Sequence, residues 1–512
     1  MKTFELTLIL LVCAVALVAL AGRLRVPSPA LLALGGGALA LLPQAPELKL
    51  DPGLALALFV APVLLDAAFD TSLRDLRRNW IPVTCLVLIV VGLTTLGVAW
   101  VVHRMLPAMP WSAAIALGAI VAPPDAAAAT AVLRQVHLPH RLLIILEGES
   151  LLNDASALLI YRLAIAATLG TVTTADIAPA LALGIVGSFV VGYVLSHATF
   201  WLVSHVRDAP SSVVLQFAAT FGVWLLADRL GLSPVVTVVV FAITTARFAP
   251  ARQAARLRLP SYAVWDTVVF VLNVLAFVLI GLQLRPIFIG LQPDERIAYL
   301  QVAVAVLGAV IFVRFLWVAG YATTARLKTR WFGAGAWPGK NLPTARGSIL
   351  VGWCGMRGIV TLAAAYALPE KFPFRDLIVL CAFCVVVGTL VLQGMTLRPL
   401  MHLLQIAQDD VVAREVRDAR LRLAQAALDL LDDDDSSESV ALRREFCALL
   451  DGADADGFDG RTAHDALRAR VIDAQRNVLL RMRDDAEIGD TAFHEIEAQL
   501  DWAEANARGL TE

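Results

Sequence analysis

The residues whose types could do chemistry lie in an otherwise apolar stretch between about positions 142 and 169. The segment Glu-Ser-Leu-Leu-Asn-Asp, from Glu149 to Asp154, brings two carboxylates, a hydroxyl and an amide into it. Ionisable groups are costly at membrane depth, so they are rare there and mark ion or proton paths. On a helix, Glu149 and Asn153 are one turn apart, and so are Ser150 and Asp154. We therefore expect an ion site on this face rather than only a polar seam between helices.

Two other apolar stretches carry an aspartate. Asp66 lies in the run Val-Leu-Leu-Asp-Ala-Ala-Phe, and Asp125 directly follows Pro123 and Pro124. Two consecutive prolines remove amide donors and clash with the preceding turn, so the helix should break there and free backbone carbonyls beside the carboxylate. An ordinary proline kink, with Asp125 capping the resumed helix, is the alternative.

A buried cation is predicted by the segment Gly-Trp-Cys-Gly-Met-Arg-Gly-Ile-Val at 352–360. It places Arg357 in an apolar stretch interrupted by glycines. A buried guanidinium needs an anion. We predict that Glu149 supplies it, which leaves Asp154 free for another partner.

The composition of the chain indicates a polytopic membrane protein. Of its 512 residues 58% are hydrophobic and 17% charged, and the mean hydropathy is +0.72. These values are far too apolar for a soluble protein of this length. Thirteen apolar runs are long enough to cross a bilayer. They fall at about 4–22, 28–43, 53–70, 81–102, 111–134, 141–170, 178–203, 213–231, 234–250, 263–284, 297–325, 347–368 and 376–402.

The connections between these runs predict their orientation, because lysine and arginine collect on the cytoplasmic side. One alternate set of connections carries 17 basic residues and the other carries 7. Thirteen crossings, with the N-terminus outside and the C-terminus inside, account for this asymmetry. The run at 4–22 lacks a clear cleavage site, so we interpret it as a membrane helix rather than a signal peptide.

From about residue 403 the chain changes character. We divide it into a membrane domain, 1–402, and a helical cytoplasmic tail, 403–512, with a regulatory or oligomerising role. In the tail, apolar residues recur at helical spacing, for example Val412, Val416 and Leu423. The acidic segments 432–435 and 451–460 lack the ligand spacing of a calcium-binding EF-hand loop, and we interpret them as linkers. Cys381 and Cys384 have no further ligands nearby and are interpreted as packing residues.

The two interrupted segments are the fifth and the twelfth runs. An odd offset reverses direction through the membrane, so two halves of about six helices would be inverted repeats. Paired broken helices in such halves are typical of the ion site of a secondary transporter. No nucleotide-binding loop is present, which argues against an ATP-driven pump. We expect neither enzymatic activity, nor a cofactor, nor nucleic-acid binding.

Three motifs make the sequence resemble the monovalent cation:proton antiporters, in particular the sodium/proton exchanger branch with an Asn-Asp pair. They are the segment 149–154, Ala-Pro-Pro-Asp-Ala at 122–126, and Gly-Met-Arg-Gly-Ile-Val-Thr at 355–361, followed by Leu-Ala-Ala-Ala-Tyr-Ala-Leu-Pro. The resemblance covers the membrane domain and not the tail. It implies about thirteen helices in a dimerisation part and a core part, two crossing broken helices, and a homodimer. We expect it in a bacterial plasma membrane.

The resemblance also implies a role for each motif residue. Asp154 matches the aspartate that binds the cation or the proton, and Ser150 matches a cation ligand. Asn153 matches their structural neighbour, and Asp125 an acidic residue of the broken helix near the site.

The remaining matches include a buried ion pair and two positions at which this chain departs from its relatives. Glu149 and Arg357 match a buried ion pair that holds the core together, and Asp66 aligns with a glutamate that contributes to ion coordination. Where many relatives have threonine, this chain has Pro124, which offers only its backbone carbonyl. The aspartate at position 66 is also one methylene shorter, so both departures affect the predicted cation shell and the choice of cation.

These residues predict exchange by competition. The carboxylate of Asp154 cannot hold a proton and a cation together, and a bare buried charge is costly to move. Either ion must therefore neutralise it before the core changes sides. Because Asn153 is neutral, one cation for one proton is the simplest stoichiometry. We expect a Na⁺/H⁺ antiporter, with Li⁺ a further substrate, that serves pH homeostasis; a K⁺/H⁺ antiporter and, less readily, a gated cation channel are the alternatives.

Overall fold

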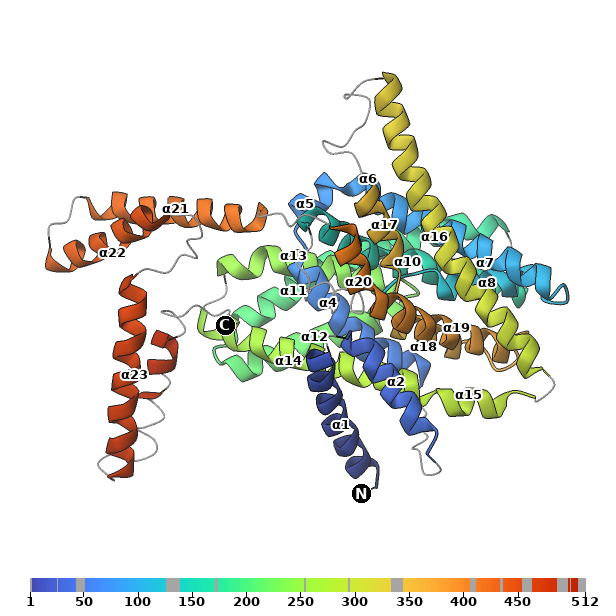
Figure 1. The fold of residues 1–512 in the computed structure, drawn as a ribbon, viewed down its shortest axis with the longest axis horizontal. Helices are drawn as coiled ribbons and strands as arrows, with labels where there is room; N and C mark the ends of the chain where they lie inside the picture. The colour runs from blue at the N-terminus through green and yellow to red at the C-terminus, as the bar shows by residue number, and fades with distance from the viewer. Residues whose placement is uncertain are drawn as a thin grey trace. The chain divides into compact units, whose positions relative to one another are not determined.

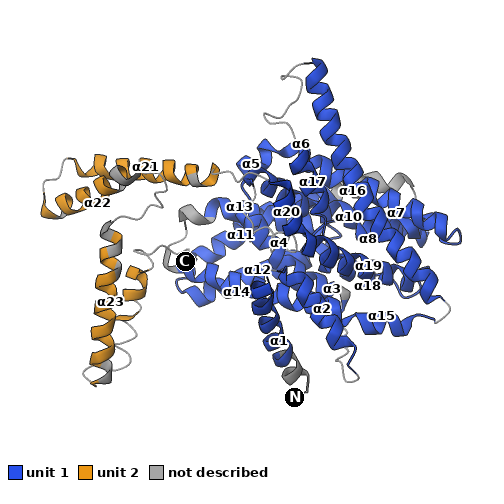
Figure 2. Cartoon of the chain, viewed as in Figure 1, with its two compact units in different colours: residues 1–408 blue, residues 409–512 orange. Residues whose placement is uncertain are grey.

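The computed structural model describes residues 2–24, 26–42, 51–125, 139–170, 174–252, 255–292, 295–332, 344–405, 411–432, 436–453, 463–485, 496–497 and 499–504. The chain divides into two compact units, residues 1–408 and 409–512 (Figure 2). All regular elements of the described residues are helices (Figure 1). The predicted all-α class is therefore confirmed.

Helices of the first unit coincide with the predicted apolar runs. Seven described helices are long and apolar enough to cross a membrane, and shorter apolar helices account for other runs. The number of thirteen crossings stays a prediction. In chain order the helices are α1 (Lys2–Leu24), α2 (Ser28–Ala40), α3 (Pro52–Ala55), α4 (Ala61–Asp70), α5 (Leu73–Arg78), α6 (Trp80–Thr84), α7 (Val91–Met105), α8 (Trp111–Val121), α10 (His140–Thr168), α11 (Thr174–Ser204), α12 (Ala209–Arg229), α13 (Pro234–Arg252), α14 (Ala255–Leu282), α15 (Leu284–Gly290), α16 (Arg296–Phe332), α17 (Ala345–Trp353), α18 (Ile359–Tyr366), α19 (Arg375–Thr389) and α20 (Met395–Leu404).

Three of the long helical segments contain a π-helical turn. Leu56–Val60 joins α3 to α4, Cys85–Val90 joins α6 to α7, and Leu390–Gly394 joins α19 to α20. Such turns insert a residue into an α-helix and are frequent at functional sites. The turn at Cys85–Val90 packs on α10, and the turn at Leu56–Val60 packs on α18.

The contact between α2 and α14 depends on glycine. A Cβ atom added at Gly281 would overlap the carbonyl oxygen of Ala33 and lie 2.5 Å from the amide nitrogen of Gly37. Gly36 is equally tight against the carbonyl of Val278. Small residues let two membrane helices approach closely, so this glycine pair fixes the distance between α2 and α14.

One face of α10 packs against an apolar cluster. Its buried members include Leu64 of α4, Leu151 of α10, Trp224 of α12 and Val238 of α13. Leu151 lies within the predicted site segment, so this cluster holds the polar face of α10 in a fixed orientation.

The second unit contains α21 (Val411–Leu431), α22 (Ser437–Ala453) and α23 (Ala463–Asp484). Helices α21 and α22 pack on each other, and the Arg443 guanidinium donates to the carbonyls of Leu431 and Asp432 at the end of α21. Much of the predicted apolar stripe is nevertheless exposed, as for Leu423 at 70%. The two acidic segments lie largely outside the described residues.

Candidate cation site

The predicted site segment lies in the middle of α10, a helix of 29 residues. Glu149, Ser150, Asn153 and Asp154 are all buried, and the exposed fraction of Asp154 is 8%. Their spacing puts them on one face of the helix, as predicted. Two carboxylates are therefore removed from solvent within two turns of a single helix.

The fifth apolar run breaks where the prolines predict it. Helix α8 ends at Val121, and residues 122–125 are not helical. The freed carbonyl of Pro124 accepts hydrogen bonds from the Asn153 side-chain amide at 2.9 Å and from the Ser150 hydroxyl at 3.3 Å. The break thus brings a backbone oxygen against the polar face of α10. Residues 126–138 lie outside the described residues.

The twelfth run breaks as well, between α17 and α18. The two breaks meet, because the Asp125 amide donates to the Met356 carbonyl at 2.7 Å. A Cβ atom added at Gly358 would overlap the Asp125 carboxylate, so only glycine leaves room for that carboxylate. Asp125 in turn acts electrostatically on Asp154. The structure therefore brings Asp125 and the Pro124 carbonyl, where the two breaks meet, against the face of α10 that carries Asp154.

The predicted ion pair between Glu149 and Arg357 is wrong. Arg357 is buried, but its guanidinium donates to three backbone carbonyls: Val121 at 3.0 Å, Ala122 at 3.1 Å, and Gly355. The last carbonyls of a helix lack intrahelical partners and carry partial negative charge. The carbonyls at the end of α8 thus accept the hydrogen bonds of Arg357, for which we had predicted a carboxylate partner.

Glu149 instead pairs with Arg314 of α16, which is completely buried. Its two terminal nitrogens lie 2.5 and 2.8 Å from the two carboxylate oxygens of Glu149. The same guanidinium donates to the carbonyls of Val351 and Cys354, both at 3.1 Å, where α17 ends. Each of these two arginines therefore satisfies carbonyls at the end of the helix before one break, and Arg314 also binds a carboxylate.

The sequence contained a signal for Arg314. It lies in the middle of the apolar run 297–325, where an ionisable side chain is as unexpected as in α10. Arg357 was predicted as a buried cation because glycines interrupt its apolar run. Arg314 lies in an uninterrupted helix, but when buried it needs an anion in the same way.

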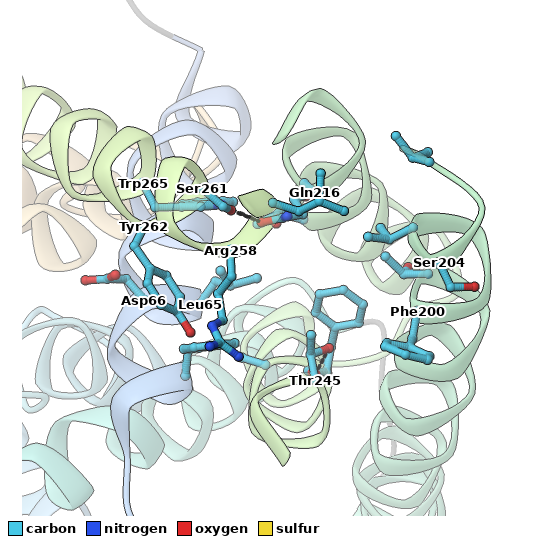
Figure 3. A pocket seen from close by; sticks show the side chains of 18 of the residues that line it. Leu65, Asp66, Phe200, Ser204, Gln216, Thr245, Arg258, Ser261, Tyr262 and Trp265 are labelled. Atoms are coloured by element: carbon cyan, nitrogen blue, oxygen red, sulfur yellow. Dashed lines mark hydrogen bonds between the residues drawn. The ribbon is translucent and has the colours of Figure 1, made fainter. Parts of the chain in front are cut away.

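Asp66 lies on a helix that packs against α10. It is half-buried on α4 and belongs to the lining of a cavity of about 660 Å³ that does not include Asp154 (Figure 3). Figure 3 shows its carboxylate on the side of α4 that faces away from Phe200. A contribution of Asp66 to cation coordination stays a prediction.

Comparisons with known proteins agree with this geometry. A family model described as "sodium/hydrogen exchanger, transmembrane" matches residues 8–403. An uncharacterized Na⁺/H⁺ exchanger of Mycobacterium tuberculosis is 32% identical over 94% of this chain and 92% of its own length. A sodium, potassium, lithium and rubidium/H⁺ antiporter of Bacillus pumilus is 29% identical over 93% of this chain and 73% of its own length.

The fold is also similar to a solved structure. The sodium proton antiporter MjNhaP1 of Methanocaldococcus jannaschii matches with a TM-score of 0.59 at 18% identity. The match covers 78% of this chain and 98% of the other. At this identity the likeness concerns the fold alone and not the ions that are transported.

Proposed function

This chain belongs to the sodium/hydrogen exchanger family, and we propose that it exchanges Na⁺ for H⁺, one for one, by competition at Asp154. The observation that carries the proposal is the meeting of the two breaks against α10. There the Pro124 carbonyl lies on the polar face that carries the buried Asp154, and Asp125 acts electrostatically on that aspartate. Oxygen ligands of this kind suit a hard monovalent cation, and an aspartate can bind a proton equally well.

The burial of Asp154 supports the stoichiometry. The exposed fraction of Asp154 is 8%, and a bare charge is costly to move through a low-dielectric membrane. A single monovalent cation or a single proton neutralises this carboxylate, and the side chain of Asn153 beside it is neutral. The form in which Asp154 binds neither ion is then the one that cannot change sides.

The ligand set follows from the same contacts. Ser150 and Asn153 both donate to the Pro124 carbonyl, and a bound cation would share that oxygen. Asn153 holds the carbonyl at the site, and the Ser150 hydroxyl oxygen is a ligand type that suits a hard cation. We propose Asp154, Ser150 and the Pro124 carbonyl as ligands, with Asp125 completing the negative field.

The test is exchange by purified protein in liposomes, followed by a dye for internal pH after pulses of sodium salt. We expect Na⁺-dependent proton movement that an imposed membrane voltage does not drive. Asp154→Asn should abolish it, since an amide binds neither proton nor cation charge. The apparent Na⁺ affinity should rise with pH until Asp154 is fully deprotonated. Persistent exchange in Asp154→Asn would overturn the assignment, and downhill Na⁺ flux without proton movement would indicate a channel.

A second candidate is exchange of K⁺ for H⁺. The antiporter of Bacillus pumilus is named for four alkali cations, so its site accepts ions larger than Na⁺. The same liposomes, pulsed with lithium, potassium and rubidium salts, rank the cations for this chain.

We also propose that the protein is a homodimer with its C-terminal tail in the cytoplasm. Its helices identify it as an integral membrane protein. The mass of the detergent-solubilised protein tests the dimer, and protease access to the tail in sealed vesicles tests the orientation.

A further inference from the structure

Helix α21 of the second unit has two apolar faces. The first face contains the buried Ala424 and the half-buried Leu421 and Leu428. Helix α22 packs on α21, and its Arg443 guanidinium donates to the Leu431 carbonyl at the end of α21. We therefore assign the first face to the contact between α21 and α22, so this face already has its partner within the chain.

The second apolar face of α21 is exposed. Its members, which we call the α21 seam, are Val412, Val416, Ala419, Leu423, Ala426 and Leu430. They follow one another at alternating spacings of four and three residues, as positions d and a do in a coiled-coil heptad. Leu423 is 70% exposed and Leu430 is 83% exposed. Every exposed apolar side chain that the structure describes on α21 belongs to this seam.

The narrow width of the α21 seam favours a single helix as its partner. A helix that packs on a broad surface or lies on a membrane has an apolar face of about 100° or more. Here Asp418, Arg422 and Asp429 are exposed directly beside seam residues. An apolar stripe limited to positions a and d is the contact surface of a coiled coil.

The α21 seam is complementary to itself. In a parallel pair of identical helices, each a or d residue meets its own counterpart, so Val416 meets the same valine of the second copy. Leu423 and Leu430 meet their counterparts in the same way. All six layers are then apolar, and no layer brings a charged side chain into the contact.

The charge of Arg422 favours the parallel orientation over the antiparallel one. An antiparallel pair that aligns the apolar layers is centred near residue 421, midway between Val412 and Leu430. It places the two Arg422 side chains next to each other, and like charges beside a seam are destabilising. In a parallel pair, Arg422 instead lies beside the small, uncharged Ala427 of the second copy.

We propose that α21 pairs with α21 of a second copy of this chain, as a parallel two-stranded coiled coil along the α21 seam. The inference rests on the homodimer proposed above, whose two tails leave the membrane on the same side. Alanine at positions 419 and 426 fills its layers only sparsely, so the pair is weak by itself. Attachment to a dimeric membrane domain raises the effective concentration of the second helix and offsets this weakness.

The test is disulfide formation between single cysteines in the full-length protein in membranes. The exposed Cys13 and Cys447 are first replaced by serine. We expect Val416→Cys and Leu430→Cys each to give a linked dimer on mild oxidation, because counterparts in a parallel pair lie within the Cα distance of about 7 Å that a disulfide needs. Gln425→Cys is the matched control, since Gln425 is exposed on α21 outside the seam, and it should give no linked dimer.

The same cross-link distinguishes the two orientations. In an antiparallel pair Val416 meets Ala426 of the second copy, so neither Val416→Cys nor Leu430→Cys would link to itself, whereas a chain with both Val416→Cys and Ala426→Cys would. That result would overturn the parallel pair. Absence of links at both seam positions, or equal linking of Gln425→Cys, would overturn the seam as the contact.

A charge placed in the seam tests the apolar contact directly. Leu423→Asp brings two like charges together in one layer and should slow the Val416→Cys link about tenfold or more. Because Leu423 is largely exposed within its own chain, this substitution leaves the contact between α21 and α22 in place. Gln425→Asp is the control and should leave the rate unchanged. An unchanged rate in Leu423→Asp would contradict the proposal.

The mass of the detergent-solubilised protein separates this inference from the homodimer itself. A dimeric mass without seam links would overturn the coiled coil and leave the homodimer, whereas a monomeric mass without links would overturn both. A link within one chain between Leu423→Cys and Val471→Cys would show that α23 covers the seam, since Val471 is exposed on α23. Quenching of a fluorophore on Leu423→Cys by lipid-attached quenchers would place the seam in the bilayer. Either of these results would overturn the proposal.

Discussion

Glu149 acts electrostatically on two buried arginines, Arg314 and Arg357, and its carboxylate hydrogen-bonds to Arg314. Removing Arg314 leaves a buried carboxylate without a partner, which costs about 3–5 kcal/mol. Removing Arg357 leaves helix-end carbonyls unsatisfied, at about 1–3 kcal/mol for each group. The two arginines are thus expected to stabilise the core by different means.

A double-mutant cycle separates them. We expect Arg314→Gln to lower the unfolding temperature strongly and Glu149→Gln to relieve part of that loss, because the pair is then removed together. Arg357→Gln combined with Glu149→Gln should show a smaller coupling energy, because Glu149 acts on Arg357 by charge and hydrogen-bonds to Arg314. Thermal unfolding in detergent measures all five variants. Equal coupling of Glu149 to both arginines would contradict the contacts described here.

At the scale of single residues, polar side chains in apolar runs predicted most of the buried groups, among them Asp154 and Arg357. Arg314 also lies in an apolar run, but it was not predicted. The two prolines before Asp125 predicted a break in the helix, and residues 122–125 are not helical. Partner choice could not be predicted in the same way. Whether a guanidinium meets a carboxylate or a helix end depends on which helices cross, and only the fold determines that for Arg357.

At the scale of elements, α5 anchors the start of the site helix. Asp75 of α5 accepts a hydrogen bond at its carboxylate from Arg74, and His140 of α10 lies 3.5 Å from the same group. Burial alone raises the pKa of Asp75, but the hydrogen bonds from Ser72, Arg74 and His140, with the charge of Arg74, outweigh it. The net effect holds the pKa of Asp75 below its ordinary value.

The sign of this shift gives a pH prediction. A depressed pKa in the folded state stabilises the fold above the unfolded value of about 3.9, and the contribution is lost as pH falls through the folded value. Asp75→Asn should therefore lower the unfolding temperature at pH 7 and have little effect near pH 3. The pH dependence of thermal unfolding, compared with the parent protein, checks this. An equal destabilisation at both pH values would show that packing, not charge, is the cause.

The α2 and α14 pair yields a second prediction at this scale. Gly281→Ala places a methyl group against backbone atoms of Ala33 and Gly37, which cannot rotate away. We expect a loss of about 1–3 kcal/mol, typical of overpacking. Gly308→Ala on α16 is the matched control, because a Cβ atom there meets nothing within 4 Å. The control should unfold at or above the parent temperature, and a harmless Gly281→Ala would argue against a close crossing.

At the scale of the whole molecule, the lengths of the apolar runs predicted where the helices lie along the chain, but not which groups satisfy the helix ends. The apolar runs coincide with helices because a bilayer-spanning segment must satisfy its own backbone groups. The cavity between α4, α11, α12, α13 and α14 had no counterpart in the sequence reasoning. Its lining residues are scattered from position 65 to position 266 over several helices, so no local sequence pattern predicts the cavity.

The division of the chain into two units leads to the last prediction. The family match ends at residue 403, and the first unit, residues 1–408, contains every residue proposed to bind the ion. A protein truncated after Gln408 should therefore fold, insert and exchange Na⁺ for H⁺ in liposomes at a rate within a few-fold of the full chain. Its pH profile should shift if the tail regulates the exchanger, and its detergent-solubilised mass should be that of a truncated monomer if the tail holds the dimer together. Loss of exchange in a truncated protein that unfolds at the parent temperature would show that the tail takes part in transport itself.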